Sequence, residues 1–181
     1  IPVCPASHYL CGGIKVDENA RTTINHLYAA GECTRTGLHG GNRLASNSLL
    51  EAIVYAEAAA QHSLPLIDNI NWCDEIPEWN DEGTTLNEEM VLITQSEKEV
   101  NQIMQAYVGI VRSNLRLKRA FDRLELIYKE TESLFQRSVV SKEICELRNI
   151  VNTAYLVIKS AMQRKESRGL HYTIDYPKKN E

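Results

Sequence analysis

The residues best suited to chemistry lie between Thr36 and Glu51, in the run Thr-Gly-Leu-His-Gly-Gly-Asn-Arg-Leu-Ala-Ser-Asn-Ser-Leu-Leu-Glu. This run places Arg43, two serines and two asparagines beside the expected start of a helix, where free N–H groups and the helix dipole are positive. Glycines let the backbone approach a ligand closely, and Arg43 can bind a carboxylate through two parallel hydrogen bonds. The pattern therefore predicts a site for an anionic ligand. An alternative stays open, in which Asn47 or Ser48 only caps the helix and Arg43 lies in solvent.

The helix that positions this segment is expected to begin at Ser48. Ser48 and Glu51 fit a capping box, and the helix should end near residues 62–63, shortly before Pro65. Its apolar positions recur at helical spacing ahead of an alanine-rich stretch: Leu49, Leu50, Ile53 and Val54. Upstream, the glycine pairs and short apolar runs predict strands and backbone-defined loops, with a hairpin around residues 17–20.

The second half of the chain has helical periodicity almost to its end. A helix behind a Ser96 to Glu99 capping box is expected to extend through Val111. A second helix follows, and a third has Ser141 as its expected N-cap. The apolar stripe of the second is Leu117, Phe121, Leu124, Tyr128, Thr131 and Phe135, and that of the third is Ile144, Leu147, Val151, Ala154, Ile158 and Ala161. Amphipathic helices with short links bury such stripes against one another, which predicts a three-helix bundle.

Composition excludes several classes of function. The 20 Lys and Arg residues against 24 Asp and Glu residues give a net charge of -4, which supplies no attraction to nucleic acid or to anionic lipid. No apolar run approaches the roughly 20 residues of a membrane-spanning helix. Five scattered cysteines favour a reducing compartment, so we expect a cytoplasmic protein. The basic stretch from Arg112 to Arg123 is expected to be a solvated or docked helix face.

Two further groups of residues suggest chemistry only weakly. Cys4, His8 and Cys11 have half of a zinc-site spacing, but no second pair follows, so no metal site is predicted. Arg168 and His171 near the C-terminus could form a reactive pair. We favour a structural role for them, in a tail that begins where Gly169 closes the last helix and packs back on the core.

Four motifs in sequence order carry a family resemblance. They are residues 8–13 (His-Tyr-Leu-Cys-Gly-Gly), the pair Gly31-Glu32, residues 39–51, and residues 166–177 (Glu-Ser-Arg-Gly-Leu-His-Tyr-Thr-Ile-Asp-Tyr-Pro). Together they resemble the C-terminal part of the succinate dehydrogenase and fumarate reductase flavoprotein family. Cys11, the pair Ala45-Ser46 and the run 170–172 are similar to the L-aspartate oxidase branch of that family. The succinate dehydrogenase branch tends to carry Met, Gly-Gly and Ala-His at these places.

The resemblance implies a role for individual residues. A substrate dicarboxylate would contact His8, Arg43 and Ser46. FAD would contact Glu32 through ribityl or ribose hydroxyls, and Ser48 and Leu49 at the edge of its isoalloxazine ring. The implied reaction is oxidation of L-aspartate to iminoaspartate for NAD biosynthesis, with fumarate or oxygen as the electron acceptor. A helix start is physically suited to this place, because reduced flavin accumulates negative charge near the same ring edge.

The resemblance also implies a fold. We expect an α+β, mainly α chain: a remnant of a glutathione-reductase-like, FAD-binding α/β domain at 1–63, a connector at 64–87, and the three-helix bundle with its tail at 88–181. The sequence lacks a Gly-x-Gly-x-x-Gly motif and the family's capping domain with its proton-handling Arg. We therefore expect the chain to be the C-terminal part of the enzyme, with no complete catalytic set, without retained FAD, and prone to self-association through surface meant for the missing domains.

Two alternatives stay open. The chain is similar enough to the wider family that a succinate dehydrogenase or fumarate reductase flavoprotein fragment is the competing enzyme. A non-enzymatic helical docking module would account for the amphipathic stripes, but it has no need of the Gly, Arg and Ser cluster between residues 31 and 48. Activity with L-aspartate rather than succinate separates the two enzymes, and bound FAD separates both from a docking module.

Overall fold

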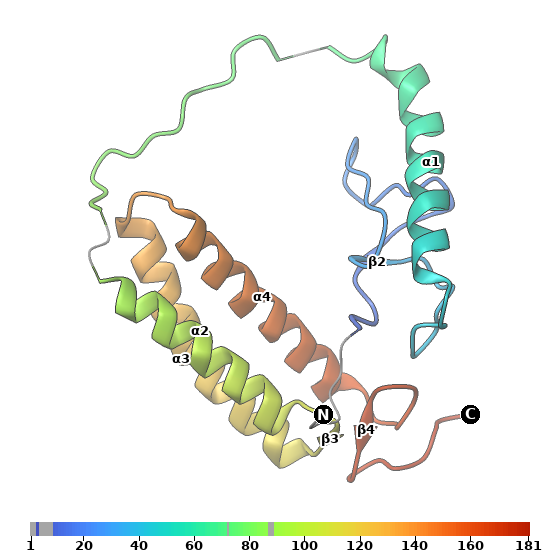
Figure 1. The fold of residues 1–181 in the computed structure, drawn as a ribbon, viewed down its shortest axis with the longest axis vertical. Coiled ribbons are helices and arrows are strands. Elements are labelled where there is room, and N and C mark those ends of the chain that lie inside the picture. Colours follow the sequence, from blue (N-terminus) through green and yellow to red (C-terminus); the bar gives the residue numbers. More distant parts are fainter. Residues whose placement is uncertain (1–2, 4–8, 72, 87–88) are drawn as a thin grey trace. The chain divides into compact units, whose positions relative to one another are not determined.

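The chain is mainly helical and forms two compact units (Figure 1). The computed structural model describes residues 3, 9–71, 73–86 and 89–181, and the units span Ile1–Ile76 and Pro77–Glu181. The helices are α1 (Ser48–Ile67), α2 (Met90–Tyr107), α3 (Asn114–Arg137) and α4 (Lys142–Gln163). The strands are β1 (Ile14–Lys15), β2 (Thr34–Arg35), β3 (Val111–Arg112) and β4 (Tyr172–Thr173). Within the described ranges, none of the helices combines the length and the apolar character needed to cross a membrane.

In the first unit, β1 pairs in parallel with β2, and Ile14 is opposite Thr34. Gly13 is required at this contact, because a Cβ there would lie 2.3 Å from the Cys33 carbonyl oxygen. The expected turn at residues 17–20 is present, but the expected hairpin pairing is wrong. The Asp17 carboxylate accepts the backbone N–H of Arg21, which tightens the turn, and beyond it only a single bridge to Tyr28 forms.

Helix α1 begins at Ser48 as predicted, but the predicted capping box is wrong. The N-cap residue is Asn47, which makes no side-chain capping bond, and the Glu51 side chain is engaged elsewhere. The predicted end near residues 62–63 is also wrong, because α1 continues to Ile67 with Pro65 inside its last turn. Pro65 has no N–H to donate within the helix, and the Asn69 side chain donates to the Pro65 carbonyl oxygen at 3.2 Å, which stabilises the helix end.

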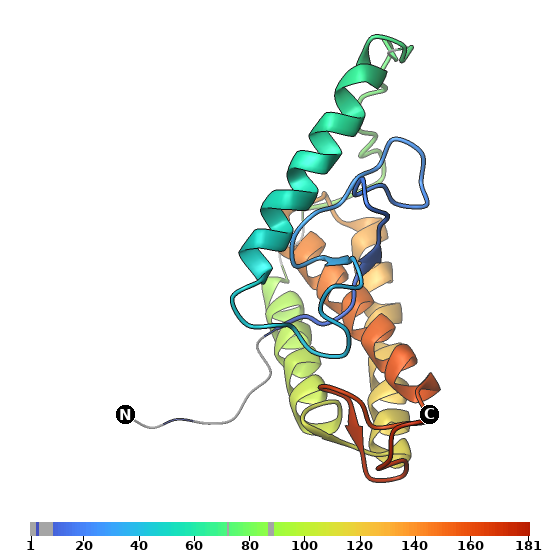
Figure 2. The same cartoon turned by 90° about the vertical axis from the view of Figure 1, so that its right-hand side faces the viewer.

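The second unit is built on one hydrophobic core shared by α2, α3 and α4, which run side by side in both views (Figure 2). Ser141 caps α4 by accepting the Ile144 N–H, as predicted. Every predicted apolar position of α4 is buried: Ile144, Leu147, Val151, Ala154, Ile158 and Ala161. In α3 the buried stripe includes Leu117, Leu124 and Thr131 as predicted, but Tyr128 is 39% exposed.

Helix α2 differs from the prediction at both ends. It begins at Met90, not at Ser96. Ile93 is buried in the core, and this packing extends the helix upstream of the Ser96 to Glu99 pattern. It ends at Tyr107, so that Val111 lies in β3 rather than in the helix. Its last turn closes where the Val108 N–H donates to the Met104 carbonyl oxygen.

The C-terminal tail folds back onto the second unit, as expected for a structural segment. β4 pairs in parallel with β3, with Val111 opposite Tyr172. Arg112 donates from Nη1 to Nδ1 of His171 at 2.9 Å, and His171 is buried. Gly169 does not close α4, which ends at Gln163. It lies with φ of 58° in the turn between Arg168 and His171, where the left-handed backbone suits glycine.

Candidate functional site

Arg43 is a buried arginine that joins three segments of the first unit. Its side chain is only 2% exposed. Nε donates to the Leu10 carbonyl oxygen at 3.0 Å, and Nη2 donates to the Glu32 carbonyl oxygen at 2.9 Å. Nη1 donates to Oε2 of Glu51 at 2.9 Å, and to Oγ of Ser48 at 3.5 Å. Because Arg43 is not in solvent, the alternative in which it is a solvated residue beside a simple cap is wrong.

Glu51 is the anionic partner of Arg43 and is itself 1% exposed at its side chain. It accepts two further hydrogen bonds, from Oγ1 of Thr36 at 2.6 Å and from Nε2 of His39 at 3.0 Å. Burial by itself would raise the pKa of Glu51. The hydrogen bonds from Thr36, Arg43 and His39 outweigh that effect and hold the pKa below its ordinary value. Glu51 is therefore an ionised carboxylate surrounded by donors.

The hydrogen bonds of His39 define its tautomer. The backbone N–H of Leu44 donates to Nδ1 of His39 at 2.9 Å, so Nδ1 carries no proton. Nε2 must then carry the proton that it donates to Glu51. His39 is thus a neutral ring that links the backbone of the loop before α1 to the buried carboxylate.

The predicted cofactor-binding residues lie around this pair. Oε1 of Glu32 accepts the Leu10 N–H at 2.8 Å, so Glu32 and Arg43 both hold the Leu10 backbone. Ser48 contacts Arg43 at the first position of α1. Leu49, which follows it, has a 79% exposed side chain. The structure therefore brings Glu32, Arg43 and Ser48 together and leaves the Leu49 side chain on the surface.

The two remaining predicted substrate residues have different outcomes. Ser46 is exposed, with φ of 65°, a left-handed conformation that costs a non-glycine residue about 1–3 kcal/mol. No hydrogen bond connects Ser46 to Arg43 within the described ranges. His8 lies outside the described residues, two positions before Leu10, so its place beside Arg43 stays a prediction.

Sequence reasoning missed the residues that hold Arg43. Glu51 was assigned to a capping box, and no role was predicted for Thr36 or His39. The available signal was that Thr36, His39 and Arg43, which can all donate hydrogen bonds, precede Glu51 in one short run of the sequence. Glu51 is the carboxylate at the helix start. A carboxylate there is consistent equally with a cap, with the helix dipole and with a buried ion pair.

The described residues fit the edge of a flavin cofactor but not the whole of it. The start of α1 has no side-chain cap, so its first N–H groups remain available to an anionic group. Leu49 offers apolar surface next to them, and Glu32 offers a carboxylate that can accept hydroxyl groups. The Gly-x-Gly-x-x-Gly motif that holds a pyrophosphate is missing from the sequence. The same region holds no metal-binding group of three or more ligands among the described residues.

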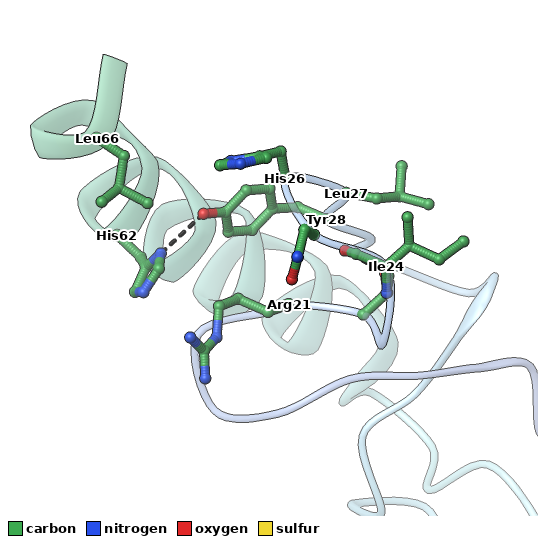
Figure 3. Close-up of a pocket in the computed structure, with 9 residues that line it drawn as sticks. Arg21, Ile24, His26, Leu27, Tyr28, His62 and Leu66 are labelled. Atoms are coloured by element: carbon green, nitrogen blue, oxygen red, sulfur yellow. Dashed lines mark hydrogen bonds between the residues drawn. The ribbon is translucent and has the colours of Figure 1, made fainter. Parts of the chain in front are cut away.

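A cavity of about 310 Å³ lies elsewhere in the first unit (Figure 3). None of the predicted site residues lines it. The Tyr28 hydroxyl and Nδ1 of His62 are 2.8 Å apart at its wall, which connects the loop at residues 21–28 to the C-terminal half of α1. Arg21, on the same wall, is paired with Asp17. These contacts hold the loop to the helix, and we assign the cavity no ligand.

Two family models match the chain. A fumarate reductase flavoprotein C-terminal model matches residues 97–181, and an FAD-binding domain model matches residues 1–49. The second stretch contains every residue predicted to contact substrate or FAD. Residues 50–96, between the two matched stretches, contain most of α1 and the connector.

Curated relatives cover nearly the whole chain. L-aspartate oxidase of Pseudomonas aeruginosa is 49% identical over 177 residues, which are 98% of this chain and 33% of the relative. L-aspartate oxidase of Vibrio cholerae is 45% identical over the same shares. Among solved structures, a variant of E. coli quinol fumarate reductase FrdA matches with a TM-score of 0.79 and 28% identity, covering 99% of this chain and 34% of that one. The chain thus spans about a third of the length of the proteins that it matches.

Proposed function

The chain belongs to the fumarate reductase flavoprotein family, and on this premise we propose that it is the C-terminal third of an FAD-dependent L-aspartate oxidase. One observation carries the proposal: L-aspartate oxidases are 45% to 49% identical to it over 98% of its length. The fumarate reductase structure is 28% identical over a similar share. This difference favours aspartate over succinate as the substrate of the complete protein.

The proposed reaction is the oxidation of L-aspartate to iminoaspartate, at the start of NAD biosynthesis. The substrate loses a hydride from Cα and a proton from its amine, which leaves a carbon–nitrogen double bond. FAD, when bound, supplies the hydride acceptor, and fumarate or oxygen serves as the final oxidant. The role of this chain is to fix the substrate, since an oriented C–H bond can lower the barrier by several kcal/mol.

Substrate fixation in this proposal depends on His8, Arg43 and Ser46. Arg43 holds positive charge at a fixed place, because its buried side chain is bound on three sides. It binds one carboxylate of the diacid, together with His8 and Ser46. The proposed FAD contacts are Ser48 and Leu49 at the uncapped start of α1, and Glu32, whose carbonyl oxygen accepts a hydrogen bond from Arg43. The left-handed backbone of Ser46 supports a preorganised loop beside that helix start.

We propose the domain organisation that follows from this assignment. Residues 1–63 complete the FAD-binding α/β domain, residues 64–87 connect, and residues 88–181 form a three-helix bundle with its tail. The preceding two thirds of the enzyme supply the phosphate-binding loop and the capping domain. Four apolar residues of α1 that are 59% to 79% exposed are the surface for that partner region: Leu49, Leu50, Ile53 and Val54. Without it, the chain is expected to lack FAD and activity and to self-associate.

The cysteine chemistry supports a cytoplasmic location for the enzyme. Four cysteines within the described ranges are free thiols: Cys11, Cys33, Cys73 and Cys145. Cys33 and Cys73 are exposed as well as free. Exposed free thiols persist best in a reducing compartment.

The test is the substrate preference of the complete protein. It should be purified with bound FAD and assayed with L-aspartate or succinate as electron donor and fumarate or oxygen as acceptor. The proposal predicts turnover with L-aspartate and none with succinate. Turnover with succinate alone would identify a succinate or fumarate flavoprotein instead. Absence of FAD together with absence of both activities would leave the helical docking module.

A further inference from the structure

Glu51 is a buried carboxylate surrounded by side chains that donate hydrogen bonds to it. Thr36, His39 and Arg43 all present donors to its two oxygens, at 2.6, 3.0 and 2.9 Å. The Thr36 hydroxyl can also accept a hydrogen bond, but His39 and Arg43 both donate to Oε2, and only an ionised carboxylate gives the Arg43 guanidinium a full negative charge as its partner. The pocket therefore fits an ionised carboxylate best.

Two of the donors are themselves held by backbone N–H groups, which restrains the carboxylate. His39 is fixed through Nδ1 by the Leu44 backbone N–H. The Thr36 hydroxyl also accepts the Leu38 N–H at 3.2 Å, so its orientation is set by the loop. Glu51 itself projects from the first turn of α1. A side chain held at this many points keeps one rotamer.

Arg43 receives its orientation from this fixed carboxylate. The two carbonyl oxygens of Leu10 and Glu32 determine where Nε and Nη2 lie, but carbonyl groups carry no net charge to retain a guanidinium in a buried place. Glu51 is the only acidic side chain that makes an ion pair with Arg43 within the described ranges. These contacts and the Ser48 hydroxyl use four of the five guanidinium N–H groups, so one N–H of Nη2 is left to donate to a substrate carboxylate, in a direction set by the plane of the guanidinium. Tilting that plane would move the bound substrate.

From these contacts we propose that Glu51 is a positioning residue for the substrate-binding Arg43, with Thr36 and His39 as its supports. Glu51 touches neither substrate nor cofactor in this proposal and acts through Arg43. Misplacement of the bound diacid by a fraction of an ångström to an ångström lowers turnover strongly, because hydride transfer depends on the aim of the C–H bond. The inference rests on the proposed function, and it adds the residues that orient Arg43 to the residues that bind the substrate.

The experiment compares Glu51→Gln, Arg43→Lys and the double variant in the complete, FAD-loaded enzyme, with rates expressed per bound flavin. Glu51→Gln is expected to lower kcat/KM for L-aspartate by about 10- to 100-fold, with a fall in kcat. In the Arg43→Lys background the same change is expected to cost less than about threefold, because the plane that Glu51 sets is gone. Glu57→Gln, an exposed glutamate on the same helix, is the matched control and should leave both constants unchanged.

Additive effects of the two substitutions, or an unchanged kcat/KM per flavin in Glu51→Gln, would overturn the inference. If Glu51→Gln does not fold, Thr36→Val replaces it. That change removes one donor to Glu51 and keeps the ion pair, and it is expected to lower kcat/KM by about threefold to tenfold. No change in that variant would equally overturn the inference. A wild-type enzyme that does not oxidise L-aspartate would contradict both the proposed function and this inference. If the wild type is active, the variants test the inference alone.

Discussion

A buried arginine facing a buried glutamate is a demanding arrangement, because both charges lose their water. Arg43 and Glu51 pair with each other, and the Thr36 hydroxyl, a neutral His39 and two backbone carbonyl oxygens bind further polar atoms of the pair. Removing one partner of such a pair typically costs about 3–5 kcal/mol, since the other is left charged and unpaired. Substitutions here therefore report on function only when the folding of the variant is checked as well.

His171 is the second buried polar side chain with consequences, and it predicts pH-dependent attachment of the tail. Burial lowers the pKa of His171, and the positive charges of Arg112 and Arg164 lower it further, against a weaker opposite effect of Glu166. The folded tail then binds a proton less readily than the unfolded tail. Stability is complete above the ordinary pKa of 6.5 and is lost as pH falls through it toward the lower folded value.

The measurement is hydrogen exchange of the Ile174 amide, which donates to the Arg112 carbonyl oxygen at 3.0 Å. Its protection should fall between about pH 7.5 and about 5.5, by at most about tenfold per pH unit. His171→Gln can still accept from Arg112 but cannot be protonated, so its protection should be flat over this interval. An equal fall in that variant would show that another group is responsible.

Residue types alone predict that the Arg43 site takes an anionic ligand, which stays a prediction, but they do not predict how the site is built. Arginine in a glycine-rich run before a helix indicates a ligand that carries negative charge, and that part needs only local chemistry. Burial of Arg43 and the use of Glu51 as its partner depend on the return of residues 10 and 32 to the same place in space. Such tertiary contacts leave no local pattern, and Glu51 fitted a simpler capping explanation.

Helices differ in how completely their sequence predicts them. All six apolar positions of α4 and its Ser141 cap agree with the structure, because cap and period indicate the same start. In α2 the cap pattern and the buried positions indicate different starts. Ser96 and Glu99 form a local cap pattern, but burial of Ile93 in the core stabilises a helix that begins at Met90. The parallel pairing of β3 with β4 joins segments about sixty residues apart and had no local signal.

Of the two faces of α4, only the buried one should contribute strongly to the stability of the second unit. Ile158 is fully buried in the shared core, and Leu156, two positions earlier, is 64% exposed. Ile158→Ala should lower the free energy of unfolding by about 2–5 kcal/mol, through lost burial and the cavity left behind. Leu156→Ala, the control on the same helix, should change it by less than about 0.5 kcal/mol. Urea unfolding followed by circular dichroism checks both, and comparable losses would contradict the core described above.

For the molecule as a whole, the two units have unequal interiors. The second has a continuous apolar core, whereas the first is held by short strands, backbone bonds and the Arg43–Glu51 pair, with apolar side chains of α1 outside. A unit that exposes the apolar face of its main helix has surface for another part of the protein. This agrees with a chain that spans about a third of its curated relatives.

The central claim is that a dicarboxylate is bound by Arg43 in the complete enzyme. Its most direct test is kcat/KM for L-aspartate in the Arg43→Leu and Arg43→Lys variants, each shown to be folded and to hold FAD as the wild type does. The exposed Arg21→Lys change is the control. The account predicts a fall of about 100-fold or more, or about 2.7 kcal/mol of transition-state stabilisation, in both Arg43 variants and none in the control. An unchanged kcat/KM in either Arg43 variant at full flavin content would contradict it.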